Sequence, residues 1–193
     1  MKSIAVFCGS SIGFNPIYSQ EAKKLGEYFA AHDIEMVFGG GKIGMMGVMA
    51  DALIAKKGRI IGVIPGLLRH EEVEHDEVTQ MIVTKTMSKR KVKISKLVDG
   101  YLALPGGFGT LDEIFEALTL SQLGIEQKPI GVLNTNGFFN NLIKQLEVMV
   151  EEGYLKQSNK DMLLVSDSVD VLMEKMLNYK APELGEVHQK IVR

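Results

Sequence analysis

Short runs of apolar residues alternate with helix-like segments along nearly the whole chain. Runs such as IAVF and IIGVI are continuous, which is typical of strands buried on both faces of a sheet. Between the runs, apolar residues such as Ala22, Leu25 and Phe29 recur at helical spacing. A chain in which strands and helices alternate forms a parallel sheet covered by helices on both faces. We therefore predict an α/β fold.

The expected elements follow one another without repeats or low-complexity linkers in a chain of 193 residues. The expected strands span residues 3–8, 35–38, 59–65, 78–84, 100–105, 129–134 and 162–166. The expected helices span residues 17–31, 46–57, 86–98, 110–123, 137–152 and 168–178. This length suits one domain, so we predict a single-domain, Rossmann-like, doubly wound sheet of about seven strands. We assign residues 1–180 to this domain and residues 181–193 to a polar C-terminal tail.

Charge and cysteine content exclude several classes of protein. The net charge is −2, whereas a nucleic-acid binder carries a broad basic face. The one cysteine, Cys8, has no partner for an internal disulfide, which fits a reducing compartment. The N-terminal apolar run is too short for a signal peptide, and no stretch reaches the ~18 apolar residues of a membrane span. We expect a cytoplasmic protein without a nucleic-acid or membrane partner.

Several glycine-rich or polar segments follow the expected strands. In open parallel sheets, ligands bind beyond the carboxyl ends of the strands. The segments that fall there are residues 9–11, 39–41, 66–77 and 105–107. The fold therefore gathers these loops along one rim, and Ser10 and Gly40 are candidate ligand contacts within them.

The stretch GGGKIGMMG contains the pattern G-x-G-x-x-G in Gly39, Gly41 and Gly44. A dinucleotide site also needs an acidic residue about 20 positions on, at the end of the next strand. That strand ends at Pro65, and the next acid is Glu71. This disfavours an NAD-dependent oxidoreductase. The glycines either permit tight turns and close helix packing or lie near a bound phosphate, and both alternatives remain open.

The stretch PGGFGT gives a more specific signal. Gly106, Gly107 and Gly109 allow backbone N–H groups to converge at the start of a helix, and Thr110 adds a hydroxyl group. Unpaired N–H groups and the positive end of the helix dipole favour an anion. No Gly-Lys-Ser/Thr follows, so this segment is not the P-loop of a protein that binds nucleoside triphosphates.

Two interpretations compete for the acids that open this helix. Thr110-x-x-Glu113 matches a capping box, in which each side chain bonds the other residue's backbone N–H. Alternatively, Glu113 points over the rim toward a ligand whose phosphate rests on the glycine loop.

The basic run MSKRK also lies near the rim. Such runs are usually solvated, but Arg90 has the planar fork that clamps a phosphate or ribose oxygen, and Lys91 adds a charge.

Other polar residues indicate no further chemistry. His70 and His75 flank three glutamates, but their spacing matches no zinc signature, so we expect a solvated surface and no metal. Cys8 lies in an apolar strand and is better explained as a small buried residue than as a nucleophile. Ser10 and Ser11 have no evident histidine partner for a hydrolase triad.

Taken together, these segments resemble the Lonely Guy family of cytokinin riboside 5′-monophosphate phosphoribohydrolases. The family's PGGxGTxxE motif corresponds to residues 105–113, and its MHxRK element corresponds to residues 87–91. CGSS after the first strand, GGGxxGxMG after the second and the run at 122–142 also correspond. The resemblance extends from residue 4 to about residue 178. Ser88 stands where the family usually has histidine, and Leu120 stands where many members carry an aromatic residue.

The resemblance implies that Arg90 and Glu113 are the catalytic pair and that the protein is a homodimer without a cofactor. The substrate contacts that it implies, together with the rim glycine Gly106, are Glu72, Lys91, Gly107, Phe108, Gly109, Thr110, Leu111, Asp112 and Thr119. The family has also been labelled lysine decarboxylase, but we identify no site for pyridoxal phosphate in the sequence.

The implied reaction is hydrolysis of the N-glycosidic bond of AMP or a cytokinin nucleotide. The glycine-loop amides and Arg90 would hold the 5′-phosphate. Glu113 would stabilise positive charge on the anomeric carbon, orient the attacking water or accept its proton. The alternative from another class is a carrier that binds a nucleotide or a molybdenum cofactor without cleaving it.

Overall fold

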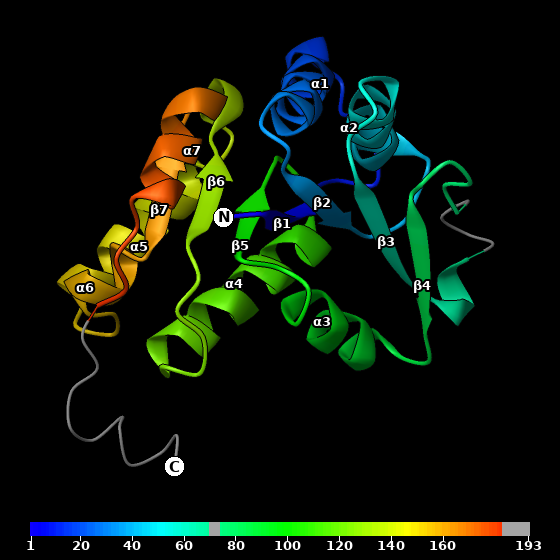
Figure 1. Cartoon of the computed structure of the whole chain (residues 1–193). Coiled ribbons are helices and arrows are strands. Elements are labelled where there is room, and N and C mark those ends of the chain that lie inside the picture. Colours follow the sequence, from blue (N-terminus) through cyan, green and yellow to red (C-terminus); the bar gives the residue numbers. More distant parts are fainter. Residues whose placement is uncertain (70–73, 183–193) are drawn as a thin grey trace.

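A computed structural model describes residues 1–69 and 74–182 of the chain (Figure 1). The described strands form one seven-stranded parallel sheet in the order β4-β3-β2-β1-β5-β6-β7. Their bounds are Ser3–Phe7 (β1), Glu35–Phe38 (β2), Ile60–Pro65 (β3), Gln80–Thr84 (β4), Gly100–Ala103 (β5), Ile130–Leu133 (β6) and Leu163–Ser166 (β7). The predicted α/β fold is confirmed, since each expected strand is present and every pairing is parallel.

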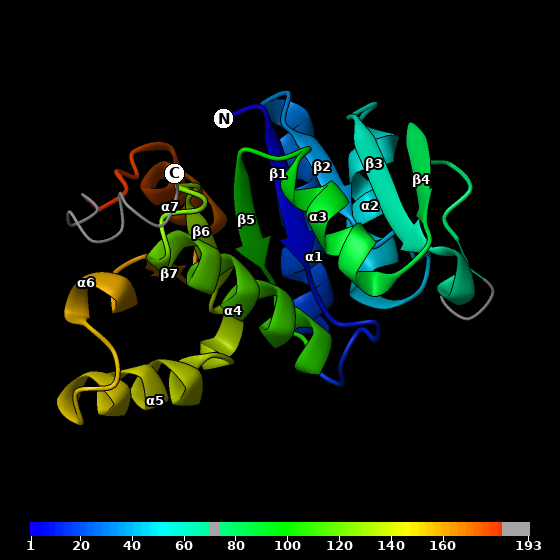
Figure 2. The ribbon, with the colours of Figure 1, turned by 90° about the horizontal axis from the view of Figure 1, so that it is seen from below.

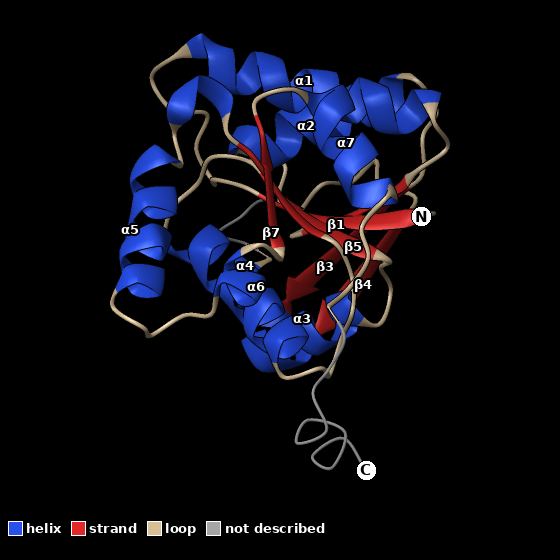
Figure 3. Cartoon of the chain, turned by 90° about the vertical axis from the view of Figure 1, so that its left-hand side faces the viewer, coloured by secondary structure: helices blue, strands red, loops and turns tan. Residues whose placement is uncertain are grey.

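Helices cover both faces of the sheet (Figure 3). The helices are Pro16–Ala31 (α1), Gly44–Ala55 (α2), Met87–Ser95 (α3), Phe108–Gln122 (α4), Asn140–Glu151 (α5), Gln157–Lys160 (α6) and Val169–Leu177 (α7), with 3-10 turns at Gly66–Leu68 and Thr135–Gly137. α1, α2 and α7 pack on one face, and α3, α4 and α5 pack on the other. Figure 2 looks onto the face that α3 and α4 cover. The short helix α6 was not expected from the sequence.

Alternate residues of the central strands enter two hydrophobic clusters on opposite faces of the sheet. In β1, Ile4 and Val6 join the cluster beneath α1 and α2, whereas Ala5 and Phe7 join the cluster beneath α3 and α4. All four side chains are buried. This explains why the strands show continuous apolar runs, because both faces of a doubly covered sheet exclude water.

The strand order reverses direction between β1 and β5 at the centre of the sheet. The chain builds outward from β1 through β2, β3 and β4 and then returns to the other side of β1 with β5. The loops after β1 and β5 are held together, since Leu104 N–H donates to Phe7 O at 2.9 Å and Gly9 N–H donates to Pro105 O at 3.0 Å. Ligand crevices form at such reversals in open α/β sheets.

No helix in the described part of the chain combines the length and the apolar character needed to cross a membrane.

Candidate active site

Helix α4 begins earlier than its sequence pattern predicts. It starts at Phe108, with Gly107 in the N-cap position and no side chain bonded to the cap. Thr110 is thus the third helical residue and Glu113 the sixth, so the predicted capping box is wrong. Thr110 is 3 % exposed, and its hydroxyl group packs closely on Gly106, where a side chain would overlap it.

The start of α4 presents backbone donors toward the crevice. The first helical hydrogen bond of α4 runs from Leu111 N–H to the carbonyl oxygen of the N-cap residue Gly107, at 3.2 Å. The amides of Phe108, Gly109 and Thr110 precede it and are the orphan donors of a helix N-terminus. Together with the helix dipole, they favour an anion at this point.

A cavity of about 280 Å³ lies at the reversal of the sheet, and we call it the glycine-loop cavity. Its described walls come from the end of β1, the loop after β2, the beginning of α3 and the first turns of α4. It brings together eight of the residues predicted from the sequence: Ser10, Arg90, Gly107, Phe108, Gly109, Thr110, Asp112 and Glu113.

Arg90 is a buried cation in this cavity, with 7 % of its surface exposed. Its Nε has no hydrogen-bond partner, and Nη1 lies 4.0 Å from Met87 Sδ. No described residue forms an ion pair with it. A methyl group added to Gly39 would overlap the Arg90 guanidinium, so the glycine makes room for the arginine. A buried cation is costly unless an anion neutralises it, so an anionic ligand would be stabilised beside Arg90.

Cys8 and Glu113 both line the glycine-loop cavity. Burial raises the pKa of the Cys8 thiol, and the charge of the Glu113 carboxylate raises it further. Cys8, which is half-buried, therefore remains a neutral thiol. This argues against a nucleophilic role, because the thiolate is the nucleophilic form.

Lys91 points away from the glycine-loop cavity. Its Nζ lies 2.7 Å from Asp112 Oδ2 and 2.9 Å from Glu116 Oε2, and these ion pairs join α3 to α4. Burial lowers the pKa of Lys91, but the hydrogen bonds to the two carboxylates outweigh it, so the net shift is upward. The amine stays protonated at neutral pH.

The remaining predicted contacts lie outside this cavity. Thr119 is exposed, and its hydroxyl group donates to Phe115 O at 2.7 Å. Leu111 packs on the core cluster beneath α3 and α4. Gly40 is buried with a φ of 86°, and Gly106 faces a separate hollow beside Tyr18. Glu72 lies outside the described residues, as do His70 and Glu71.

His75 departs from the prediction of a solvated surface, because it is 1 % exposed. Its Nε2 lies 3.1 Å from Asp51 Oδ1, and its Nδ1 accepts the Glu77 N–H at 3.3 Å. His75 N–H also donates to Gly40 O at 2.9 Å. The histidine thus fastens the loop after β3 to the loop after β2. Among the described residues, no cluster of three or more metal-binding side chains occurs.

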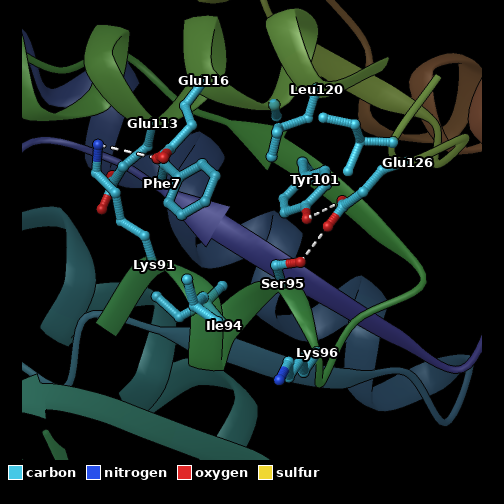
Figure 4. Close-up of a pocket in the computed structure, with 13 residues that line it drawn as sticks. Phe7, Lys91, Ile94, Ser95, Lys96, Tyr101, Glu113, Glu116, Leu120 and Glu126 are labelled. Atoms are coloured by element: carbon cyan, nitrogen blue, oxygen red, sulfur yellow. Dashed lines mark hydrogen bonds and ion pairs between the residues drawn. The ribbon is translucent and has the colours of Figure 1, made fainter. Parts of the chain in front are cut away.

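A second cavity of about 280 Å³ lies between α3 and α4, and we call it the helix cavity (Figure 4). It shares Phe7 and Glu113 with the glycine-loop cavity. Its apolar walls include Ile94, Leu120 and Ile125.

A polar cluster lines one part of the helix cavity. Glu126 accepts hydrogen bonds from Ser95 and, at 2.5 Å, from the Tyr101 hydroxyl group, and Lys128 Nζ lies 3.3 Å from the same carboxylate. Burial raises the pKa of Glu126, but the Ser95 and Tyr101 hydrogen bonds outweigh it and keep the acid ionised. Sequence reasoning missed this cluster because its members come from three separate segments. The isolated acid in SQLGIEQKPI was the one available signal.

The sequence is similar to a protein family and to several named relatives. A family model described as possible lysine decarboxylase matches residues 46–176. A cytokinin riboside 5′-monophosphate phosphoribohydrolase of Arabidopsis thaliana is 35% identical over 191 residues, which cover 99% of this chain and 88% of the relative. A second from the same plant is 38% identical over 178 residues, covering 92% and 84%. A probable enzyme of this name from Oryza sativa subsp. japonica is 36% identical, covering 99% and 76%.

Solved structures with a similar backbone carry a different description. The molybdenum cofactor carrier protein of Chlamydomonas reinhardtii has a TM-score of 0.69 at 22% identity, covering 92% of this chain and 99% of that one. The molybdenum cofactor binding protein of Rippkaea orientalis has a TM-score of 0.68 at 24% identity, covering 90% and 93%. At these identities the likeness shows the fold alone.

Proposed function

Because this chain belongs to the family of the cytokinin riboside 5′-monophosphate phosphoribohydrolases, we propose that it hydrolyses purine nucleoside 5′-monophosphates at the N-glycosidic bond. The substrates are AMP or its N6-substituted cytokinin counterparts. The products are the free base and ribose 5-phosphate. This reaction needs an anion site, a carboxylate beside the sugar and room for the base.

The observation that carries the proposal is the buried guanidinium of Arg90, which forms no ion pair with any described residue, beside the orphan amides of α4. A phosphate group would accept hydrogen bonds from the amides and supply the counter-ion of Arg90. The free nucleoside lacks this dianion, so the site favours the monophosphate.

Glu113 supplies the carboxylate. It lies on α4, one turn beyond Gly109 and Thr110, and lines the same cavity. Cleavage of the bond from C1′ to the base leaves positive charge on the ribose, which a carboxylate stabilises. The base, which left with the bonding electrons, takes up a proton from solvent. Water bonds to C1′ and loses its proton to Glu113, which returns it to solvent.

Lysine decarboxylation through pyridoxal phosphate does not fit the residues of this site. That chemistry needs a lysine that forms a Schiff base. None of the described residues lining the glycine-loop cavity is a lysine. Lys91, beside it, is held protonated by Asp112 and Glu116.

We also propose the cytoplasmic homodimer that the family resemblance implies. Exposed Val92 and Ile125 beside the helix cavity support an association surface. Phe115 and Leu118 on α4 are partly buried and pack on the core. Light scattering during size-exclusion chromatography measures the mass, and a mass near 21 kDa would contradict a dimer.

A panel of nucleoside 5′-monophosphates tests the activity. The protein is incubated with each nucleotide, and free base is measured by chromatography, with adenosine as the control that lacks the phosphate. We expect adenine from AMP and far less from adenosine. Tight binding of nucleotides without release of any base would instead support the carrier alternative.

A further inference from the structure

The backbone after β2 determines where the Arg90 guanidinium lies. The side chain is buried, its Nε has no hydrogen-bond partner, and no described residue forms an ion pair with it. The guanidinium lies directly against Gly39, where an added methyl group would overlap it. Packing on this backbone therefore sets where Arg90 meets the glycine-loop cavity, and a shift of Gly39 would move the anion site that Arg90 forms with the α4 amides.

A short segment after β3 holds this backbone in place. Glu74 forms an isolated antiparallel β-bridge with Gly41. The next residue, His75, donates its N–H to Gly40 O at 2.9 Å. The two contacts fix the two residues that directly follow Gly39.

The ring of His75 anchors that segment in turn. Residues 74–77 belong to no helix or strand. The ring is buried, and its Nδ1 accepts the Glu77 N–H at 3.3 Å, so the ring proton is on Nε2. Nε2–H then donates to Asp51 Oδ1 at 3.1 Å, and Asp51 is on α2. The histidine thus connects an irregular segment to a helix that is packed on the sheet.

The second side-chain contact of this segment is weaker. Lys42 Nζ lies 2.7 Å from Asp76 Oδ1, but both side chains are exposed. Ion pairs between exposed side chains contribute little to stability. Breaking a bond of the buried His75 ring, by contrast, leaves a nitrogen without a partner and away from water, which is costly. The histidine is therefore the stronger anchor.

The helix that receives this anchor also borders the glycine-loop cavity. Met46, on α2 like Asp51, lines the cavity together with Gly39 and Arg90. The bond from His75 to Asp51 therefore fixes the loop after β2 relative to another wall of the same cavity.

We propose that His75 is a positioning residue for the anion site. Through Asp51 it fixes residues 74–77, which hold Gly40 and so keep Gly39 against the Arg90 guanidinium. This inference rests on the proposed function, because it takes the phosphate of the nucleotide as the anion that Arg90 binds. Binding of the phosphate should depend on the His75 ring, whereas the chemical step at C1′ should not.

Ribose 5-phosphate and AMP separate these two effects. The Kd of ribose 5-phosphate, which has no bond left to cleave, is measured by titration calorimetry, and kcat and KM are measured with AMP. His75→Asn keeps an acceptor for the Glu77 N–H, since asparagine bonds the backbone two residues on, as Asn15 does with Ile17. Its shorter side chain does not reach Asp51.

His75→Asn should raise the Kd of ribose 5-phosphate and the KM of AMP about fivefold, the effect of one hydrogen bond. The value of kcat should stay within about twofold, because the phosphate is bound equally before and during the reaction.

Asp51→Ala removes the same contact from its other partner. It should reproduce the effect of His75→Asn, and the double variant should bind ribose 5-phosphate no more weakly than either single variant. His32→Asn is the matched control. It makes the same chemical change at an exposed histidine, whose ring nitrogen lies 2.8 Å from Tyr28 O, and should leave Kd, KM and kcat unchanged.

The outcomes decide between a positioning role and a merely structural one. An unchanged Kd in His75→Asn would overturn the inference, as would a loss confined to kcat or to the temperature of unfolding. If His75→Asn does not fold, Asp51→Ala still decides, because the Asp51 side chain is 68 % exposed.

Failure of this inference differs from failure of the proposed function. Adenine release from AMP with unchanged KM in both variants would overturn the role of His75 and leave the function standing. Absence of adenine release would remove the function, while the Kd of ribose 5-phosphate would still test His75. If the unchanged protein does not bind ribose 5-phosphate, the inference also fails, since there is no anion site to position.

Discussion

Gly39→Ala should displace Arg90 from its place in the glycine-loop cavity, which Gly39 also lines. A methyl group at Gly39 would overlap the Arg90 guanidinium and lie 2.9 Å from Met46 Sδ. Gly39 is not among the residues with positive φ, so alanine can adopt its backbone conformation. The whole effect of the substitution therefore acts through side-chain overlap, and the guanidinium must leave its place in the cavity.

The magnitude follows from what Arg90 provides. A hydrogen bond from a charged donor contributes about 1.5–3 kcal/mol. Its loss lowers kcat/KM for AMP roughly 10- to 150-fold. Overpacking by the methyl group lowers the free energy of unfolding by about 1–3 kcal/mol, which urea unfolding measures separately. Gly66→Ala is the matched control, because its nearest atoms would lie 3.8 and 3.9 Å from the added methyl group and it is exposed.

A double-mutant cycle isolates the mechanism. kcat/KM for AMP is measured for Gly39→Ala, Arg90→Ala and the double variant. If the methyl group acts by displacing the guanidinium, Gly39→Ala should cost almost nothing further once Arg90 is alanine. An equal loss in both backgrounds would refute the reasoning.

Three further predictions concern the same cavity and the fold around it. Gly109→Ala should weaken AMP binding at least tenfold without lowering the urea midpoint, since an added methyl group there meets no protein atom within 4 Å; a lower midpoint would contradict this. The pKa of Cys8 is raised in the folded state, so the folded protein should react with iodoacetamide at pH 8 far more slowly than the protein unfolded in urea. The stability that the neutral Cys8 thiol contributes should decrease as pH rises above about 8.5. The hydrogen bond from Lys2 N–H at 2.6 Å is the main cause that lowers the pKa of Asp99. The stability that the Asp99 carboxylate contributes is therefore present above about pH 4 and is lost as pH falls through the lower folded-state pKa. Asp99→Asn should therefore flatten the acid limb of stability against pH, and an unchanged limb would count against this.

The sheet could be predicted because doubly covered strands are apolar along their whole length. The runs around Ile4 and Ile61 fall in opposite clusters at alternate positions, as such strands require. Parallel topology then placed the glycine loops on one rim. Helix starts were harder, since Gly109 lies in the first turn of α4 although glycine is a weak helix former.

The chemical details of the site depended on contacts between distant segments. The basic run MSKRK is compatible with a solvated face, yet Arg90 is buried, and the missing side chain of Gly39 leaves room for its guanidinium. His75 lies in an acidic stretch that suggests solvent, yet Asp51 and the backbone of Glu77 bond its ring. The spacing of residues in the sequence does not predict such contacts between distant segments.

The most direct test of the account is a single-turnover measurement on Glu113→Gln with AMP, in which bound nucleotide and released adenine are followed in the same sample. The account predicts that the variant binds AMP within about threefold of the unchanged protein, because Arg90 and the α4 amides remain, while adenine release falls by a factor of about 10² or more. Adenine release at the unchanged rate would contradict the claim that Glu113 acts on the bound sugar.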